Sequence, residues 1–104
     1  MAEYSRPSYS CRNCRNPLAS GIHLLSKSYL AKSGQAYLFS EAKNIVEGEK
    51  EKRQLITGLF KIADIHCSNC GQLLGWKYLK AYDFKQKYKE GKFIIERAKI
   101  AKEY

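Results

Sequence analysis

The sequence has few of the features that place a protein in or across a membrane. No stretch approaches the roughly 18 consecutive apolar residues of a transmembrane helix. The start of the chain, MAEYSRPSYS, has no apolar core of the kind found in signal peptides. We therefore expect an intracellular protein, in which cysteines stay reduced and bind metals more often than they form structural disulfides.

Residues that commonly carry catalysis are also scarce. The chain contains no GxSxG, HExxH, P-loop or paired-carboxylate motif, and it has 4 cysteines and 2 histidines. All the cysteines belong to CxxC pairs, so none is left over as a nucleophile. His23 has no partner in sequence, and His66 lies beside Cys67, where neighbouring ligands would have poor bite geometry. We expect Asp64 to hydrogen-bond turn backbone near the cysteines and the protein to have no enzymatic activity.

The four cysteines, Cys11, Cys14, Cys67 and Cys70, form two C-x2-C pairs with 52 residues between them. The two-residue spacing lets a tight turn point both sulfurs at one ion, and two such turns complete a tetrahedral site for Zn²⁺. Gly71 suits the sharp turn of a zinc knuckle. Four thiolates close the coordination shell, which predicts one structural zinc ion. The alternative, a thioredoxin-like redox pair, would need a βαβ context and only one CxxC.

Charge is the other conspicuous feature of the 104-residue chain, whose formal net charge is +9. Residues 77–104 hold nine lysines and arginines against four acids. A basic segment of this kind attracts nucleic acid or acidic protein surfaces. The plainer alternative is a solvated face that keeps the protein soluble.

The pattern of aromatic and β-branched residues predicts a mostly β, antiparallel domain. We expect strands over residues 22–30, 35–39, 54–67 and 73–82, the third of them bent or paired near Gly58.

Other segments are less regular. Residues 41–53, EAKNIVEGEKEKR, predict a long exposed loop with a short strand at NIV. Residues 83–91 predict one helical turn ended by Gly91, and residues 92–103 fit strand and helix, with the alternation favouring a strand. Residues 1–8 are predicted to be a flexible leader, and residues 9–104 a single domain.

Four stretches, YSCRNC, SKSYLAKSGQAYLFS, LITGLFKIADIHCSNCGQLLGWKY and QKYKEGKFIIERA, closely resemble the Yippee-like protein family from about Tyr9 to Ile100. The resemblance implies an intracellular zinc-binding domain whose ligands match the four cysteines. It also implies a fold similar to the thalidomide-binding domain of cereblon and to methionine sulfoxide reductase B. In that fold two antiparallel sheets lean together like a tent, with zinc at the apex.

The same resemblance suggests a pocket. The ligand cage of cereblon includes a tryptophan in a similar GWK-aromatic strand, which matches Trp76 and Tyr78. The further cage tryptophans of cereblon have no counterpart here, and Phe60 stands where many family members have histidine. Tyr37 and Phe39 alternate onto one face of their strand and could join Trp76 and Tyr78 around an aromatic pocket for flat or cationic ligands or peptide side chains. The alternative is that these rings are ordinary core.

Two functions follow as expectations. The first is a non-enzymatic adaptor that presents a pocket or groove to a protein partner. Family members are linked to the nucleus and to ubiquitin-related and cell-cycle assemblies, so the resemblance implies a partner of this kind and a nuclear or cytoplasmic location. The second is direct nucleic-acid binding, in which lysines of the basic C-terminal third contact phosphates while Tyr82, Phe84 or Tyr88 stack on bases. Arginine is scarce in that segment, with only Arg97, and acids interrupt it.

Overall fold

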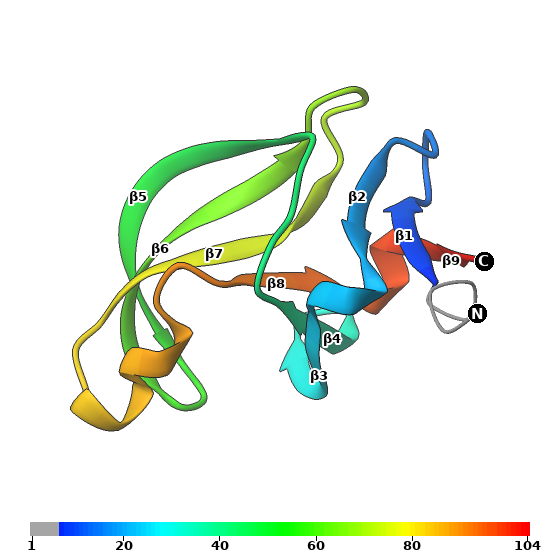
Figure 1. Cartoon of the computed structure of the whole chain (residues 1–104). Coiled ribbons are helices and arrows are strands. Elements are labelled where there is room, and N and C mark those ends of the chain that lie inside the picture. The colour runs from blue at the N-terminus through cyan, green and yellow to red at the C-terminus, as the bar shows by residue number, and fades with distance from the viewer. Residues whose placement is uncertain (1–6) are drawn as a thin grey trace.

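The backbone folds into two antiparallel β-sheets that lie side by side (Figure 1). The computed structural model describes residues 7–104. The smaller sheet has the order β2-β1-β9 and comprises β1 (Ser8–Cys11), β2 (Pro17–Ser20) and β9 (Ile100–Glu103). The larger sheet has the order β3-β4-β8-β7-β6-β5. Its strands are β3 (Leu24–Ala31), β4 (Gly34–Phe39), β5 (Ile45–Leu55), β6 (Gly58–Cys67), β7 (Leu73–Ala81) and β8 (Phe93–Glu96). The prediction of a mostly β fold with two antiparallel sheets is confirmed.

The smaller sheet joins the two ends of the described chain. β1 pairs with β9 from Ser8 opposite Glu103 to Cys11 opposite Ile100. The Ser10 hydroxyl donates a hydrogen bond of 2.8 Å to the Glu103 carboxylate, which also pairs with Arg15. Of the predicted leader, residues 1–6 lie outside the described residues. The sheet begins at Ser8, one residue before the predicted domain boundary.

The prediction of a long loop over residues 41–53 is wrong. Most of this segment belongs to β5, an 11-residue edge strand that pairs with β6 along nearly its whole length. Its side chains are mostly exposed on both faces, so the segment lacks the alternation of apolar and polar residues that marks a half-buried strand. Backbone pairing to β6 holds it in place, and charged side chains are typical of sheet edges. The hairpin turns at Ile56 and Thr57, and Gly58 follows with φ of 142°.

The predicted helical turn is a 3-10 helix, η3 (Phe84–Lys89). The Asp83 side chain accepts a hydrogen bond of 3.0 Å from the Lys85 N–H, and Gly91 follows with φ of 81°. The chain then runs back beside β7, because the Gly91 N–H donates to the Tyr78 carbonyl at 2.8 Å.

Residues 92–103 form two short strands, β8 and β9, rather than one. A 3-10 turn, η4 (Arg97–Lys99), separates them, and they belong to different sheets. A further 3-10 turn, η2 (Gly21–His23), precedes β3 where the sequence predicted continuous strand. Within residues 7–104, none of the helices has the length and apolar character that a membrane crossing requires.

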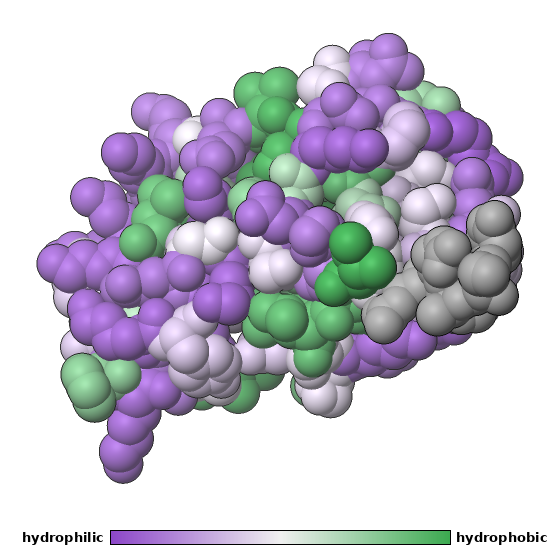
Figure 2. All heavy atoms as spheres, in the orientation of Figure 1, coloured by the Kyte–Doolittle hydropathy of each residue, from purple (hydrophilic) through white to green (hydrophobic). Residues whose placement is uncertain are grey.

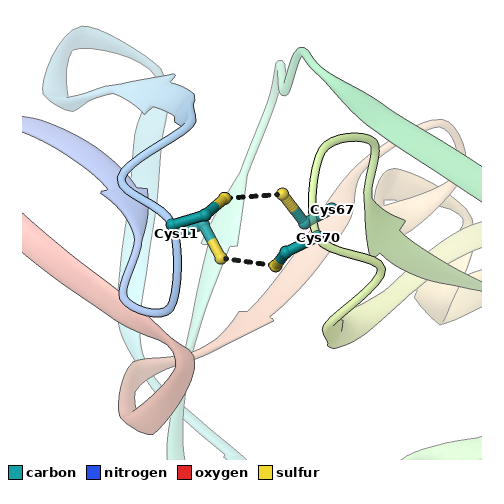
Figure 3. Close-up of side chains that lie close together, drawn as sticks. Cys11, Cys67 and Cys70 are labelled. Atoms are coloured by element: carbon teal, nitrogen blue, oxygen red, sulfur yellow. Dashed lines mark hydrogen bonds between the residues drawn. The ribbon is translucent and has the colours of Figure 1, made fainter.

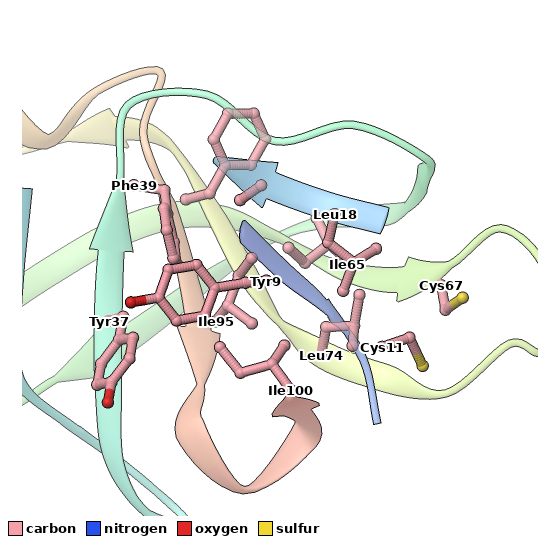
Figure 4. Close-up of a cluster of buried hydrophobic side chains, with 12 residues drawn as sticks. Tyr9, Cys11, Leu18, Tyr37, Phe39, Ile65, Cys67, Leu74, Ile95 and Ile100 are labelled. Atoms are coloured by element: carbon pink, nitrogen blue, oxygen red, sulfur yellow. The ribbon is translucent and has the colours of Figure 1, made fainter. Parts of the chain in front are cut away.

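The buried side chains form two clusters. The first contains side chains from both sheets and fills the space between them (Figure 4). Its aromatic members are Tyr9, Tyr37, Phe39 and Phe93, packed with Leu18, Ile65, Leu74, Ile95 and Ile100. The second cluster comes from the larger sheet alone and contains Ala36, Leu38, Phe60, Ile62, Trp76, Tyr78, Ala81 and Ile94. Alternate residues of β4 and β8 therefore enter different cores, as the period of two along a strand requires.

Candidate metal centre and aromatic cavity

The four cysteines lie together where the two sheets meet (Figure 3). Cys11 ends β1 and Cys67 ends β6, and the second cysteine of each pair lies in the turn that follows. All four sulfur atoms are within 4.8 Å of one another. The Sγ atoms of Cys11 and Cys70 are 3.6 Å apart, and those of Cys14 and Cys67 are 3.5 Å apart. No cysteine forms a disulfide. The prediction that both CxxC pairs converge on one site is confirmed.

The two cysteine turns have the same backbone pattern. The Arg15 N–H donates to the Cys11 carbonyl at 2.7 Å, and the Gly71 N–H donates to the Cys67 carbonyl at 2.9 Å. Arg15 and Gly71 occupy equivalent positions, with φ of 66° and 79°. A left-handed residue is thus needed one position after each second cysteine, which is the reason for glycine in the second turn. In the first turn an arginine adopts the same conformation.

The sulfurs also receive side-chain hydrogen bonds, and these cross between the turns. The Asn16 amide donates to the Cys67 sulfur at 3.4 Å, and the Gln72 amide donates to the Cys11 sulfur at 3.4 Å. Asn16 and Gln72 occupy equivalent positions, immediately after the left-handed residues. Sequence reasoning missed both amides, although the repeated spacing in CRNCRN and CSNCGQ was a signal that could have found them.

These surroundings change the acidity of the thiols. Burial acts to raise the pKa of Cys67, but hydrogen bonds from the Cys70 N–H and the Asn16 amide outweigh it and lower the pKa to about 6. Burial raises the pKa of Cys11 to about 11 against hydrogen bonds from the backbone of Cys14 and Asn13. A bound divalent metal ion deprotonates the thiols that coordinate it.

The geometry fits a tetrahedral metal ion. Four sulfurs at about 2.3 Å from a central Zn²⁺ would lie roughly 3.8 Å from one another. The two measured separations of 3.5 and 3.6 Å are close to this value. Amide donors to the sulfurs are the kind of outer partner that orients and stabilises metal-bound thiolates.

Other residues considered as ligands lie elsewhere. Among residues 7–104, the cluster that could hold a metal consists of cysteines alone. His66 lies on β6 opposite Val46, and His23 lies in η2 with Nδ1 3.5 Å from the Ser40 hydroxyl. Asp64 does not bond turn backbone as predicted. Its carboxylate pairs with Arg53 at 3.1 Å, across the β5–β6 hairpin.

The second candidate site is a cavity of about 710 Å³. Its walls come from the end of β3, the β5–β6 hairpin tip, β7 and η3. Trp76, Tyr78, Tyr29 and Tyr88 provide aromatic walls, and no cysteine lines it among the residues that the structure describes. On the face shown in Figure 2, apolar side chains gather in small groups between broad hydrophilic areas.

The predicted four-ring pocket needs correction. Trp76 and Tyr78 line the cavity, but Tyr37 and Phe39 do not. Tyr37 and Phe39 pack against Tyr9 between the sheets, with ring centroids 5.9 and 5.4 Å from that of Tyr9. The two pairs lie in different cores because each strand sends alternate side chains to opposite faces of the sheet. Phe60 packs on Tyr78 with centroids 4.8 Å apart and is completely buried.

Two antiparallel sheets that meet at a cluster of four cysteines define a small β domain with a candidate metal centre. Sequence comparison defines its family. A family model described as Yippee zinc-binding/DNA-binding /Mis18, centromere assembly, matches residues 8–103. The chain therefore belongs to the Yippee-Mis18 family.

Curated relatives agree with this assignment. The chain is 52% identical to a yippee-like protein of Arabidopsis thaliana over 99% of this chain and 98% of that protein. It is 53% identical to yippee-like 3 of Homo sapiens over 85% of this chain and 74% of that protein. A crystal structure of the Mis18 Yippee-like domain matches with a TM-score of 0.76, covering 96% of this chain and 97% of the other. At 13% sequence identity, this last match shows the fold alone.

Proposed function

We propose that this protein is a non-enzymatic binding module, held together by one structural Zn²⁺, that uses the cavity beside Trp76 and Tyr78 to hold part of a protein partner. The observation that carries the proposal is the cavity itself, a volume of about 710 Å³ with aromatic walls. This volume lies within the usual range of ligand sites, roughly 300–1,000 Å³.

The metal supports the fold rather than a reaction. Four thiolates would leave Zn²⁺ no open position for a substrate or a water molecule. The ion would be held by Cys11, Cys14, Cys67 and Cys70, and it would tie the β1–β2 turn of one sheet to the β6–β7 turn of the other. Binding of this type supplies folding free energy on the order of 10 kcal/mol.

The proposed partner is a protein within the nucleus or cytoplasm. The family model's description names centromere assembly, and the related Mis18 domain shares the fold. The description of the family model supports a place in an intracellular assembly, of the cell-cycle or ubiquitin-related kind that the resemblance implied. A net charge of +9 favours an acidic partner surface.

Nucleic-acid binding is the second candidate, and one observation favours it. Phe84 and Tyr82 are 85% and 42% exposed, and the ammonium groups of Lys52 and Lys80 lie 5.3 and 5.2 Å from the centroid of the Tyr82 ring. Exposed rings among lysines are suited to stacking on bases next to neutralised phosphates. The description of the family model also includes DNA binding.

Affinity capture from a cell lysate separates the two functions. The bait is the zinc-loaded protein, compared with three variants and with or without nuclease. Trp76→Ala removes the cavity wall, Ile56→Glu places a charge at the rim, and Phe84→Ala removes an exposed ring outside the cavity. Ile56 lines the cavity but is 84% exposed, so its replacement leaves the core intact even if Trp76→Ala fails to fold.

We expect a defined set of proteins that survives nuclease, is lost with Trp76→Ala and Ile56→Glu, and is retained by Phe84→Ala. If the captured material is instead lost with nuclease and with Phe84→Ala but retained by Ile56→Glu, the function is nucleic-acid binding and not binding of a protein in the cavity. Its binding would then fall steeply with added salt.

A further inference from the structure

One lysine beside the cavity is buried among aromatic rings. Lys89, the last residue of η3, is only 1% exposed. Its ammonium nitrogen lies over four rings, at 5.1 Å from the centroid of Tyr29, 5.3 Å from Phe60, 5.6 Å from Tyr78 and 5.7 Å from Tyr88. Each distance is within the 6 Å range of a cation–π contact. The chain therefore supplies its own cation to an aromatic cage.

The ammonium group has fewer polar partners than its burial would require. It donates one hydrogen bond of 2.8 Å, to the Thr57 hydroxyl at the tip of the β5–β6 hairpin. No carboxylate within residues 7–104 forms an ion pair with it. A lysine ammonium can donate three hydrogen bonds, and lysine is rarely fully buried without a charged partner. Lys89 itself lines the cavity, so an acceptor placed there would reach its unused donors.

The charges around the cavity have one sign. Its lining includes the cations Lys32, Arg53 and Lys89, and no acidic residue is among the lining side chains that the structure describes. Arg53 is held by Asp64 and Glu51, and Lys32 is exposed. Lys89 is thus the buried cation of this lining, and no carboxylate within residues 7–104 pairs with it.

We propose that the cavity binds a carboxylate carried on an apolar body, with Lys89 as its donor, and that it rejects cationic ligands. The reason for the rejection is that the aromatic faces which would attract a cation already hold Lys89. This reverses the sequence-based expectation that an aromatic pocket here would suit cationic ligands.

The inference rests on the proposed function in one respect, namely that the carboxylate belongs to a protein partner, as an acidic side chain or a chain end beside an apolar residue. Burial lowers the pKa of Lys89, and a bound carboxylate would favour its charged form and raise that pKa again.

The test uses the single tryptophan of the chain, Trp76, as a fluorescent reporter inside the cavity. The zinc-loaded protein is titrated with phenylacetate and with benzylammonium, two probes that share a ring and differ in the sign of their charge. We expect phenylacetate to bind at least about tenfold more tightly, a difference of about 1.4 kcal/mol. Equal affinities, or a preference for benzylammonium, would overturn the inference without any variant.

Two variants assign the preference to Lys89. Lys89→Met keeps the length and apolar contacts of the side chain and removes its charge, so the preference for phenylacetate should disappear. Lys85→Met makes the same change on the same 3-10 helix, at an exposed residue outside the cavity lining, and should leave the preference unchanged. A folded Lys89→Met protein that still prefers phenylacetate tenfold would refute the assignment to Lys89. If that variant does not fold, Lys89→Gln takes its place.

A last arm separates the source of the carboxylate from the chemistry of the site. A short peptide that ends in phenylalanine is compared with its C-terminal amide. Tighter binding of the free acid supports a protein partner. Binding of phenylacetate without binding of either peptide would keep the carboxylate preference and refute the protein partner. Failure of the carboxylate preference and failure of the proposed function are therefore distinguishable.

Discussion

Gly75 is the residue at which the smallest change should have the largest effect on the fold. It lies in β7 between Ile65 of β6 and Ile95 of β8. A Cβ atom at this position would lie 2.0 Å from the Ile94 carbonyl oxygen and 2.9 Å from the Ile94 carbonyl carbon. Both are backbone atoms of a paired strand, so no rotation of a side chain can relieve the contact. Gly75→Ala must push β7 and β8 apart.

The size of the effect follows from that geometry. Ordinary contacts of a Cβ atom begin near 3.4 Å, so the strands would have to move by more than an ångström. Overpacking a core is unfavourable by about 1–3 kcal/mol and occasionally more, and each hydrogen bond lost between β7 and β8 adds about 1 kcal/mol. We expect a loss of at least about 3 kcal/mol. For a domain of about 100 residues this lowers the Tm by roughly 12 °C or more.

Thermal unfolding of the zinc-loaded protein, followed by circular dichroism, measures this loss. Gly48→Ala is the matched control, because a Cβ atom there would meet the Asp64 carbonyl oxygen at an ordinary 3.5 Å. Its Tm should stay within about 4 °C of the original protein, since an exposed Gly→Ala change shifts stability by less than about 1 kcal/mol. If both variants melt together with the original protein, the close approach of β7 and β8 is not as described.

The remaining predictions concern the metal centre. Cys67→Ser removes one of four thiolates, so bound zinc should fall well below one ion per chain and cooperative unfolding should be lost, as measured by elemental analysis and denaturant titration; a soluble, cooperatively folded and zinc-free variant would contradict the structural role. Asn16→Ala and Gln72→Ala each remove one crossed amide and should weaken zinc binding by about 10–100-fold, measured by competition with a chromophoric chelator. Asn69→Ala changes an exposed side chain in the turn between Cys67 and Cys70 and should leave the affinity for zinc unchanged. Equal zinc affinities in all three variants would show that the amides do not support the site.

β5, which was not predicted as a strand, differs from the predicted strands in the burial of its side chains. β4 and β7 carry apolar residues because their side chains are buried, and β6 alternates because one face is buried more than the other. β5 is an edge strand with exposed side chains, and its position is decided by backbone pairing to β6. Backbone hydrogen bonds leave no trace in the choice of side chains, so EAKNIVEGEKEKR was indistinguishable from a polar loop.

The candidate metal centre was predictable because its chemistry is local. Two cysteines at CxxC spacing turn toward one ion whatever the rest of the chain does, and four thiols in two such pairs allow one simple arrangement. The crossed amides are less local, because Asn16 and Gln72 each reach the sulfur of the other turn. Their repeated position was visible in the sequence, but their target depends on how the two sheets meet.

By itself, the sequence determined the β character of the chain and the four residues that come together as a candidate metal centre, because side-chain periodicity and ligand spacing act over a few residues. Only the tertiary structure decided which aromatic rings pack in the same core. Tyr37 and Phe39 face one core and Trp76 and Tyr78 the other, a choice set by strand register across the sheet. It also decided the position of Lys89, one of many lysines in a basic segment. The Lys89 ammonium group lies over four rings because the chain just after η3 is hydrogen-bonded to β7. Long-range packing alone could turn that lysine from a solvated charge into the buried cation of a cavity.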